Sequence, residues 1–499
     1  MAGADSDAPR SAGPPAGGAD ATVELLDTPE AGHAVVRGGA LRTASFAAGL
    51  AIAALSAPLI VRHLGKEDYG RLLTVTTLIS LVAIITDQTL TNIATREYTS
   101  ARPEDRRPLL RAVLGLRMLL TVAGVVVVGA FAVLAGYESE MLIGVAVAGA
   151  GLLVADYVAG FAVPLAVRLQ LGWLAVSDLV RNGVNVALVV VLVLAGAGLV
   201  PFYALSGAAA LGALAVMAPV VRRDAPWMPA RDRARWRALT RDALPVAAAT
   251  AFGSLYFRVV LLLMSVTATA AETGDFSVSF RLCEIALAVP AIITASAFPV
   301  LARAADRDSA RLRNALERMA EVGLVLGGAI VVVGVLGAQV AIELVVGDEP
   351  IGDSAQALRW QLLALPANFL VAAWSYGLLS LRDHRALLRA NASAFVVAVA
   401  AALPLIQAFG ASGGAVAIVV AEVALAGLLA LALRRRGFHL HLRPRTAGVL
   451  PAAAIALGVG LGVPLPEPVG AVVGGALYGV LVLWGRVVPA EALDALRRR

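Results

Sequence analysis

Residues 101–140 read ARPEDRRPLLRAVLGLRMLLTVAGVVVVGAFAVLAGYESE, and this stretch holds the pattern that decides the fold. It begins with an arginine-rich connector, continues into an apolar segment over 111–135, and ends in a connector, 137–140, without Lys or Arg. An apolar segment of this length can cross a bilayer, because a membrane-spanning helix needs about 20 residues. The stretch therefore predicts one transmembrane helix with a basic connector on one side only.

The same alternation repeats along the chain. Arginines also gather in every second later connector, at 222–241, 303–318, 382–389 and 434–445. Lys and Arg are absent from the connectors 137–140, 197–201, 268–275, 347–354, 408–413 and 464–470. Cytoplasmic loops of polytopic membrane proteins carry an excess of basic residues, so the pattern predicts that the arginine-rich connectors are cytoplasmic.

One connector breaks this pattern. Residues 62–71 carry Arg62, Lys66 and Arg71 on the predicted outer side, where basic residues are unexpected. Glu67 and Asp68 in the same connector offset part of this positive charge, so they reduce the conflict with the predicted topology without removing it.

The composition agrees with a membrane protein. Of the 499 residues, 59% are hydrophobic and 15% are charged, whereas about a quarter of a soluble domain is charged. The net charge of +6 arises from arginines at the ends of apolar spans, which favours anchoring near anionic lipid over nucleic-acid binding. The single cysteine, Cys283, excludes an intramolecular disulfide and a cysteine-based zinc site, and we expect no metal and no cofactor.

The apolar segments predict an all-α polytopic membrane protein with about 14 transmembrane helices. The predicted spans are 41–62, 71–93, 111–135, 139–167, 174–196, 199–221, 243–267, 276–301, 319–346, 355–381, 386–408, 412–433, 447–464 and 469–487. An even number places both termini on one side, and the arginine pattern makes that side the cytoplasm.

A weak internal echo suggests how these spans are grouped. Residues 82–86, VAIIT, resemble residues 290–294, PAIIT, and Asp-Tyr-Gly at 68–70 resembles Asp-Phe-Ser at 275–277. Two six-helix halves related as a repeat would explain the echo, as in many secondary transporters. Chance similarity of Ala/Ile-rich segments is the alternative explanation.

These observations predict six regions. They are a disordered cytoplasmic tail (1–35), an N-terminal six-helix lobe (36–221), a cytoplasmic amphipathic linker (222–242), a C-terminal six-helix lobe (243–435), two additional transmembrane helices (436–488) and a cytoplasmic tail (489–499). The linker has Trp227 and Trp236 among its arginines, which is typical of a helix that lies at the membrane interface.

Polar residues within the spans indicate where a site could lie, since each is costly in lipid. Arg258 is the strongest candidate, because it lies about 15 residues from one end of its span and about 10 from the other. It either lines a cavity or pairs with a buried carboxylate. Arg281 and Glu284 are three residues apart, which fits a local ion pair or a shared site equally well.

Three further groups of polar residues are candidates. Arg359, Gln361 and Asn368 lie in the tenth predicted span and, with Arg258 and Arg281, form the predicted substrate-binding set. A stripe on one helical face predicts either a polar cavity wall or an interhelical hydrogen-bond seam: Asp178, Arg181, Asn182 and Asn185. Four acids are candidates for ion coupling or for charge balance of an arginine: Asp87, Asp156, Glu284 and Glu422.

Deep arginines favour one class of cargo. Guanidinium is always charged and binds phosphate through two hydrogen bonds, so two or three arginines in a cavity would hold a pyrophosphate and repel a cationic drug. The sequence has no Walker A, His-Glu-x-x-His or Gly-x-Ser-x-Gly motif, so neither a P-loop motor nor those hydrolytic sites are expected.

Several stretches resemble one family. Residues 63–70, HLGKEDYG, resemble the Leu-Gly-x-x-x-Tyr-Gly signature of polysaccharide flippases, the O-antigen and exopolysaccharide branch of the multidrug/oligosaccharidyl-lipid/polysaccharide exporter superfamily. Residues 272–282, ETGDFSVSFRL, are similar to that family's Gly-x-Tyr-x-x-Ala-x-Arg-Leu stretch and are followed by the typical FPVL at 298–301. Residues 410–417, GASGGAVA, look like its Gly-x-x-Gly-Ala-Ala stretch. The resemblance covers residues 35–435.

The resemblance implies two six-helix lobes around a central cavity and transport of undecaprenyl-pyrophosphate-linked glycan across a bacterial cytoplasmic membrane. Membrane lipid is an implied partner, a polysaccharide polymerase is a candidate partner, and no oligomeric state is implied. One departure concerns the seventh span, where close members read Tyr-Phe-Arg-x-Asp and residues 256–260 read YFRVV, without the aspartate. This places cation coupling in doubt and leaves Arg258 without a local neutralising group.

Other functions remain as alternatives. A lipid II flippase of the same superfamily would share the topology and the arginine-lined cavity, whereas Arg258 disfavours a cation-coupled multidrug exporter. A membrane-embedded glycosyltransferase or polymerase would need a constellation of catalytic acids and a large outer loop, and the sequence has neither. A non-transporting scaffold would leave a buried arginine as an unexplained cost.

Overall fold

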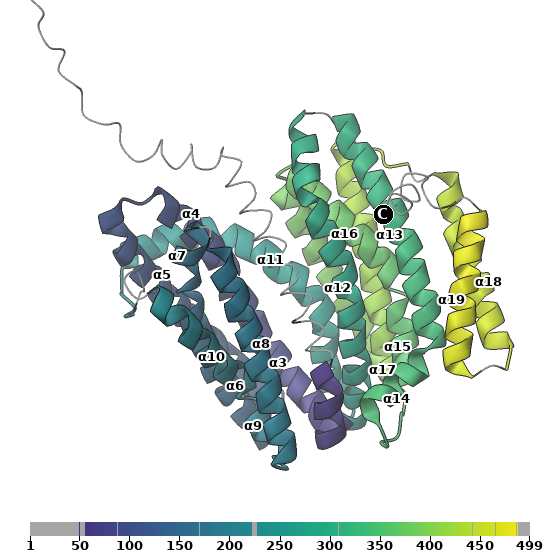
Figure 1. The fold of residues 1–499 in the computed structure, drawn as a ribbon, viewed down its shortest axis with the longest axis horizontal. Coiled ribbons are helices and arrows are strands. Elements are labelled where there is room, and N and C mark those ends of the chain that lie inside the picture. Colours follow the sequence, from purple (N-terminus) through teal and green to yellow (C-terminus); the bar gives the residue numbers. More distant parts are fainter. Residues whose placement is uncertain are drawn as a thin grey trace, which may run out of the picture.

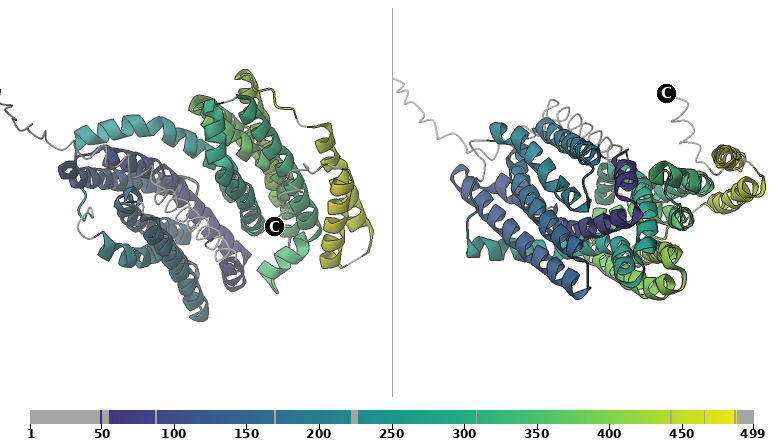
Figure 2. Two further views of the ribbon diagram at one scale, coloured as in Figure 1. Left: turned by 45° about the horizontal axis from the view of Figure 1, so that its top comes forward. Right: turned by 90° about the horizontal axis from the view of Figure 1, so that it is seen from below.

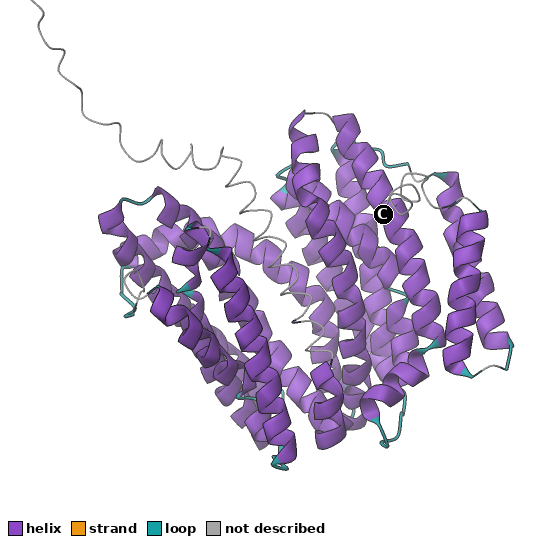
Figure 3. Cartoon of the chain, viewed as in Figure 1, coloured by secondary structure: helices purple, strands orange, loops and turns teal. Residues whose placement is uncertain are grey.

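The computed structural model describes residues 49, 55–86, 88–168, 170–221, 227–307, 309–441, 443–464, 466–485 and 487. These residues form helices joined by short loops and turns, with no strand among them (Figure 3). The all-α fold class is thereby confirmed. The predicted tails, 1–35 and 489–499, lie outside the described residues.

The helices follow the predicted spans in chain order. After a helical segment over 55–64 come α3 (Lys66–Thr86), α4 (Gln88–Ser100), α5 (Pro103–Leu134), α6 (Ser139–Ala159), α7 (Ala162–Val167), α8 (Leu171–Leu194), α9 (Leu199–Phe202) and α10 (Leu205–Val220). The second part comprises α11 (Arg233–Thr267), α12 (Ala270–Arg307), α13 (Ser309–Leu336), α14 (Ala338–Val346), α15 (Ser354–Leu362), α16 (Leu365–Ser380) and α17 (His384–Arg435). A short 3-10 helix (Pro444–Gly448), α18 (Val449–Gly462) and α19 (Glu467–Trp484) follow.

Nine helices within the described residues are long and apolar enough to cross a membrane, or ten if the bent pair α15–α16 is one span. The chain is therefore a multi-pass membrane protein. Helix lies within every predicted span, but the count of 14 stays a prediction. The pair α15–α16 bends by 43°, and α17 reverses direction at Gly410, whose φ of 51° suits glycine.

The helices form two lobes. Helices α3 to α10 pack among themselves, α11 to α17 pack among themselves, and α18 and α19 pack on α13 at the far edge of the second lobe (Figures 1 and 2). The lobes meet through α3, which packs on both α11 and α12, and through α11, which also packs on α4 and α5. In Figure 1 they touch near the beginnings of α3 and α12 and lean apart toward the opposite end.

The connectors sort to two ends of the molecule. At one end, Arg235 of α11 pairs with Asp105 of α5 over 3.4 Å, and Arg436 pairs with Asp383 over 2.6 Å within the second lobe. We call this the arginine end, and it comprises residues 101–111, 230–241, 309–321, 382–389, 434–441 and 443–445. The opposite end, where the lobes touch, is called the seam end and comprises residues 62–71, 135–140, 195–202, 265–275 and 347–354.

The predicted interfacial helix of the linker differs from the structure. Residues 227–232 are not helical, and helix begins only where the Asp232 side chain accepts a hydrogen bond from the Arg235 backbone N–H at 3.0 Å. From that cap α11 continues without a break into the seventh span, while Trp236 donates to a backbone oxygen of α5 at 2.8 Å. The cap thus joins the linker to α11, and residues 222–226 lie outside the described residues.

Small residues allow the closest helix contacts within the first lobe. A Cβ added at Gly207 of α10 would lie 2.5 Å from the Cα of Gly151 on α6, a distance at which the backbones must move apart. Lipid supplies little hydrophobic force between helices, so such close backbone packing is a main source of association.

We expect Gly207→Leu to destabilise the protein by about 1–3 kcal/mol, because the side chain overpacks the α6–α10 contact. The measurement is the Tm of the purified protein in detergent. Gly183→Leu is the matched control, since a Cβ at this glycine in α8 meets no atom within 4 Å. Equal Tm values for the two variants would contradict the contact.

Candidate functional site

Arg258 lies at the centre of a charged cluster between the lobes. Its Nη1 donates to Ser80 Oγ of α3 at 2.8 Å, and its Nη2 lies 3.4 Å from Glu284 Oε1 of α12. The second carboxylate oxygen of Glu284 lies 3.1 Å from Arg281 Nη1. One carboxylate is thus shared by two guanidinium groups, and the cluster carries a net charge of +1.

The cluster remains open to solvent despite its depth along the helices. The side chains of Arg258, Arg281 and Glu284 are 28%, 29% and 21% exposed. Arg258 therefore pairs with a carboxylate and also retains a partly exposed face, while its role in lining a cavity stays a prediction. The local pairing of Arg281 with Glu284 is likewise part of the larger cluster.

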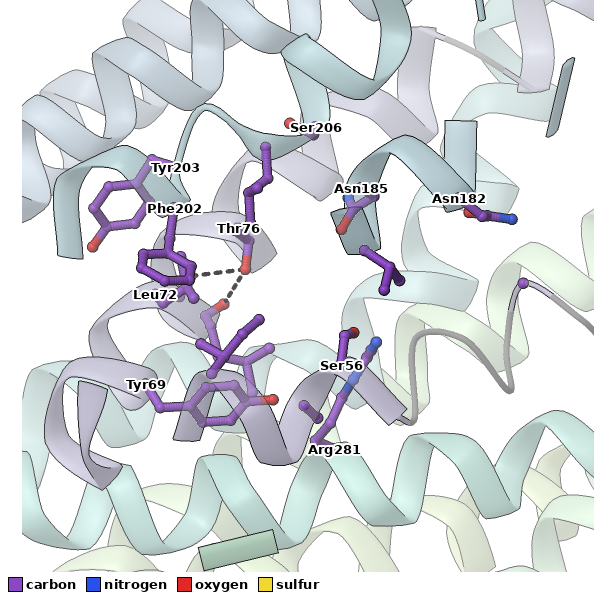
Figure 4. Close-up of a pocket in the computed structure, with 16 residues that line it drawn as sticks. Ser56, Tyr69, Leu72, Thr76, Asn182, Asn185, Phe202, Tyr203, Ser206 and Arg281 are labelled. Carbon is purple, nitrogen blue, oxygen red and sulfur yellow. Dashed lines mark hydrogen bonds between the residues drawn. The ribbon is translucent and has the colours of Figure 1, made fainter. Parts of the chain in front are cut away.

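Arg281 also borders a cavity of about 260 Å³ whose other lining residues all precede residue 221 and so lie on the side of the first lobe. Figure 4 shows its guanidinium beside Ser56, with Asn182 and Asn185 of α8 on another wall. Tyr69 and other residues of α3 complete the cavity below. The cavity therefore offers one cation and several neutral hydrogen-bonding groups, a combination that suits an anion attached to a polar body.

The predicted stripe on α8 divides into two parts. Asn182 and Asn185 line the cavity, whereas Asp178 and Arg181 pair with each other over 3.3 Å with side chains 41% and 52% exposed. Only the two asparagines thus join Arg281 in a common site.

Arg359 and Gln361 are not part of this cluster. Arg359 Nη2 of α15 lies 2.9 Å from Glu467 Oε1 of α19 and so joins the C-terminal hairpin to the second lobe. The Gln361 side chain is fully buried, and its amide has no hydrogen-bond partner within the described chain. The structure therefore does not bring the full predicted substrate-binding set together, because α15 directs Arg359 toward another neighbour.

Asn368 belongs to a separate polar group in the second lobe. The Glu422 Oε1 atom of α17 accepts hydrogen bonds from Tyr256 Oη of α11 at 2.7 Å and from Asn368 Nδ2 of α16 at 3.1 Å. Glu422 is fully buried, and its Oε2 has no hydrogen-bond partner within the described chain. A carboxyl group from another helix thus reaches the seventh-span motif, which lacks its own aspartate.

Asp156 balances an arginine that we did not identify from the sequence. Arg117 Nε of α5 lies 3.5 Å from Asp156 Oδ1 of α6, and both residues are 2% exposed. Thr121 and Thr86 also donate hydrogen bonds to Asp156. The sequence held the signal, since Arg117 lies inside an apolar span, where an ionisable residue needs a partner. Asp87 lies outside the described residues.

The seam end holds the lobes together through a second set of charges. Lys66 Nζ of α3 lies 2.5 Å from Asp275 Oδ1 of α12, with side chains only 14% and 11% exposed. Asp275 also accepts hydrogen bonds from the Asp353 backbone N–H at 3.0 Å and from Ser354 Oγ at 2.7 Å. A single carboxylate therefore connects three segments, and its two oxygens are both used.

Two glycines bring the helices close enough for this contact. A Cβ added at Gly70 would lie 3.1 Å from Gly274 Cα, and one at Gly274 would lie 2.7 Å from the backbone oxygen of Lys66. These glycines lie in the two stretches, 63–70 and 272–282, that carry the family resemblance. The close crossing gives the motif glycines a structural role.

The seam also explains the connector that breaks the arginine pattern. Arg62 donates to the backbone oxygen of Leu344 at 2.7 Å, and Arg71 pairs with Asp68 and with Glu138 over 2.7 and 2.9 Å. The basic residues of 62–71 therefore contact other parts of the protein. Their placement follows from the seam and not from the topology rule.

Two helical lobes with a cationic cluster between them define a polytopic helical membrane protein. Residues 35–305, more than half of the chain, match the family model described as "Polysaccharide biosynthesis protein". The chain therefore belongs to the polysaccharide biosynthesis protein family. No curated protein matches the sequence.

Solved structures share the fold. The lipid II flippase MurJ, in an inward closed conformation, has a TM-score of 0.73 at 12% identity, with 89% of this chain and 99% of that chain covered. A multidrug resistance MATE family transporter of the MOP superfamily, in an inward-facing conformation, has a TM-score of 0.65 at 16% identity, with 78% and 94% covered. A MOP superfamily transporter from Pyrococcus furiosus has a TM-score of 0.59 at 17% identity, with 80% and 95% covered.

We expect the Lys66–Asp275 pair to show a coupling free energy of about 1–3 kcal/mol in a double-mutant cycle. The variants are Lys66→Ala, Asp275→Ala and the double substitution, compared by denaturant unfolding in detergent. Lys66 and Asp275 are largely buried, so removing one leaves the other charge unpaired. The exposed Arg235–Asp105 pair is the control, with an expected coupling of at most about 1 kcal/mol. A similar coupling in both cycles would contradict a special role for the seam pair.

We expect Asp156→Ala to destabilise the first lobe by about 3–5 kcal/mol, because Arg117 is then left as a buried and uncompensated charge. The double variant Arg117→Met/Asp156→Leu should recover most of this loss, since it replaces the pair with apolar groups. Tm values in detergent measure both effects. If Asp156→Ala were as stable as the double variant, the unpaired charge of Arg117 would not be the cause of the destabilisation.

Proposed function

We propose that this protein is an alternating-access flippase for undecaprenyl-pyrophosphate-linked oligosaccharide in cell-surface polysaccharide biosynthesis. The single observation that carries the proposal is the cluster of Arg258, Arg281 and Glu284, which is partly exposed, lies between the lobes and has one positive charge in excess. The excess positive charge would attract a pyrophosphate, which would accept hydrogen bonds from both guanidinium groups. Membership of the polysaccharide biosynthesis family supports a glycan cargo.

The oligosaccharide would extend into the cavity next to the cluster. Asn182 and Asn185 supply amide groups there, and Tyr69 and Ser56 supply hydroxyl-bearing side chains. Neutral hydrogen-bonding side chains of this kind suit sugar hydroxyls, while the prenyl chain would stay in the lipid between the lobes.

The arrangement of the lobes supports a cytoplasm-open state. In a bacterial cytoplasmic membrane, the positive-inside rule would make the arginine end the cytoplasmic side. The lobes lean apart toward this end (Figure 1). Release of the glycan on the outer side requires the seam to open and the arginine end to close. Arg258 would take part in this change, because its hydrogen bond to Ser80 joins α11 to α3.

An ion gradient or the membrane potential would supply the energy. Among the candidate acids, Asp156 and Glu284 balance arginines, whereas Glu422 has no cation partner within the described chain. An ionised carboxylate buried without a cation is costly, so Glu422 would hold a proton or a bound cation. This makes Glu422 our candidate for ion coupling.

A lipid II flippase is the second candidate function. The fold shared with MurJ favours it, and lipid II carries a pyrophosphate that the same cluster could bind. The family match favours the other glycan carriers. A multidrug exporter of organic cations is disfavoured because the excess charge of the cluster is positive.

We expect Arg258→Ala to lower flipping of a fluorescent undecaprenyl-pyrophosphate oligosaccharide in proteoliposomes by about 10- to 100-fold, the value of one charge-assisted hydrogen bond. Arg313→Ala, at an exposed position of the arginine end, is the charge-matched control and should transport normally. Arg359→Ala should also transport normally, because Arg359 pairs with Glu467 outside the cluster.

Different outcomes would separate the hypotheses. Transport by the wild type that Arg258→Ala leaves unchanged would retain the function but overturn the head-group site. Faster flipping of lipid II than of other lipid-linked glycans would favour the second candidate. Export of an organic cation without flipping of any pyrophosphate-linked glycan would overturn the proposal.

A further inference from the structure

A groove at the arginine end of α17 has features that transport of a glycan does not explain. The two arms of α17 run antiparallel from Asp383 to the turn at Gly410 and back to Arg436, and a cavity of about 530 Å³ lies between their ends. None of its lining residues borders the cavity around Arg281. It is therefore a separate site.

The rim of the groove has an excess of positive charge. Arg389, Arg435 and Arg436 line it together with a single acid, Asp383. Asp383 is already used, because Oδ2 accepts from Arg436 Nε at 2.6 Å and Oδ1 accepts from the Ala386 backbone N–H at 3.1 Å. The hydrogen bond from Arg436 lowers the pKa of Asp383, and the charge of Arg389 adds a smaller effect in the same direction, so this carboxylate stays ionised and one acid faces three arginines.

The other two arginines are available to a ligand. Arg389 makes one hydrogen bond within the described chain, from Nε to the backbone oxygen of Arg385 at 3.3 Å, which leaves its terminal nitrogens for a ligand. Arg435 makes no hydrogen bond or ion pair within the part of the chain that the structure describes. Two exposed guanidinium groups at the mouth of one cavity can bind a phosphate through paired hydrogen bonds.

The floor of the groove is apolar and extends into the membrane. Ala386, Ala390 and Ser393 recur on one face of the first arm, and Leu428 and Ala432 face them from the second arm. Ser393 lies about 15 Å from Asp383 along the helix, at 1.5 Å per residue, which is half of a hydrocarbon core of about 30 Å. A free phosphate needs no such floor, whereas an acyl chain below a phosphate group does.

We propose that this groove binds an anionic phospholipid of the adjacent leaflet, with its phosphate between Arg389 and Arg435 and an acyl chain along the small residues of the first arm. Basic pockets between membrane helices bind lipid head groups in this way. The bound lipid would hold the two arms of α17 together at the end where the Arg436–Asp383 pair already joins them. Charge complementarity at the rim selects an anionic lipid over a zwitterionic one.

The test uses the full-length protein in a zwitterionic detergent, with lipid binding followed by native mass spectrometry and by the shift in Tm. Phosphatidylglycerol is the probe, and phosphatidylcholine and inorganic phosphate are the comparison ligands. We expect phosphatidylglycerol to bind and raise Tm, and R389Q/R435Q to weaken its binding by about 10- to 30-fold, since each basic residue contributes about a factor of five. R385Q/R434Q removes the same charge from the same helix outside the groove and should bind as the wild type does.

A second variant separates the groove from simple surface attraction. S393W fills the apolar floor and leaves every arginine in place, so it should also lose phosphatidylglycerol. Retained binding in S393W, equal losses in R389Q/R435Q and R385Q/R434Q, or equal binding of phosphatidylcholine would each overturn the proposal. An equal Tm shift from inorganic phosphate alone would assign the rim to a free anion and would also overturn it.

Discussion

The contact between Lys66 and Asp275 is the interaction on which the arrangement of the two lobes depends. It lies where α3 and α12 cross at Gly70 and Gly274, and it is a largely buried ion pair between the two lobes. In lipid, apolar faces of helices gain little by associating, so close backbone approach and polar contacts must determine which helices meet. The seam supplies both between α3 and α12. Apart from α11, which also packs on α4 and α5, the lobes lean apart from the seam toward the arginine end (Figure 1).

The seam and the arginine cluster are parts of one mechanical arrangement. Helix α3 contributes Lys66 to the seam and, further along, Ser80 to the cluster, while α12 contributes Asp275 to the seam and Glu284 to the cluster. A rotation of the lobes that separates the seam must therefore also move Ser80 relative to Arg258. The excess positive charge of the cluster suits this arrangement, because a bound anion would compensate the guanidinium groups while their protein partners change.

The sequence predicted the helices well because lipid restricts a chain so strongly. Backbone groups within a membrane must be satisfied inside each helix, so apolar length and basic connectors suffice to place the spans. Arg258, Arg281 and Glu284 were also identified, because ionisable residues are rare in spans. The sharing of Glu284 by both arginines was not predictable, because the pairing of Arg258 with Glu284 depends on how α11 and α12 rotate against each other.

Arg359 also shows that the sequence does not predict which side chains pair. Its position near the outer end of a predicted span placed it among the candidate ligands, but its partner, Glu467, is 108 residues away in the sequence and belongs to the C-terminal hairpin. The basic connector 62–71 likewise contradicted the topology rule until its partners at the seam were known. Charge patterns along a chain determine which side of the membrane a connector occupies, and only packing determines which charge neutralises which.

The buried acids differ in a way that bears on energy coupling. Asp156 lies in a closed network with Arg117, and Glu284 is shared between two arginines, so an added proton would leave cations unbalanced in both places. Glu422 differs because its described neighbours, Tyr256 and Asn368, are both neutral. Protonation there removes a buried charge without creating another. Since Tyr256 lies two residues before Arg258 on α11, a change at Glu422 would reach the cluster through a single helix, and the second lobe would carry both the ion site and the main ligand for the cargo.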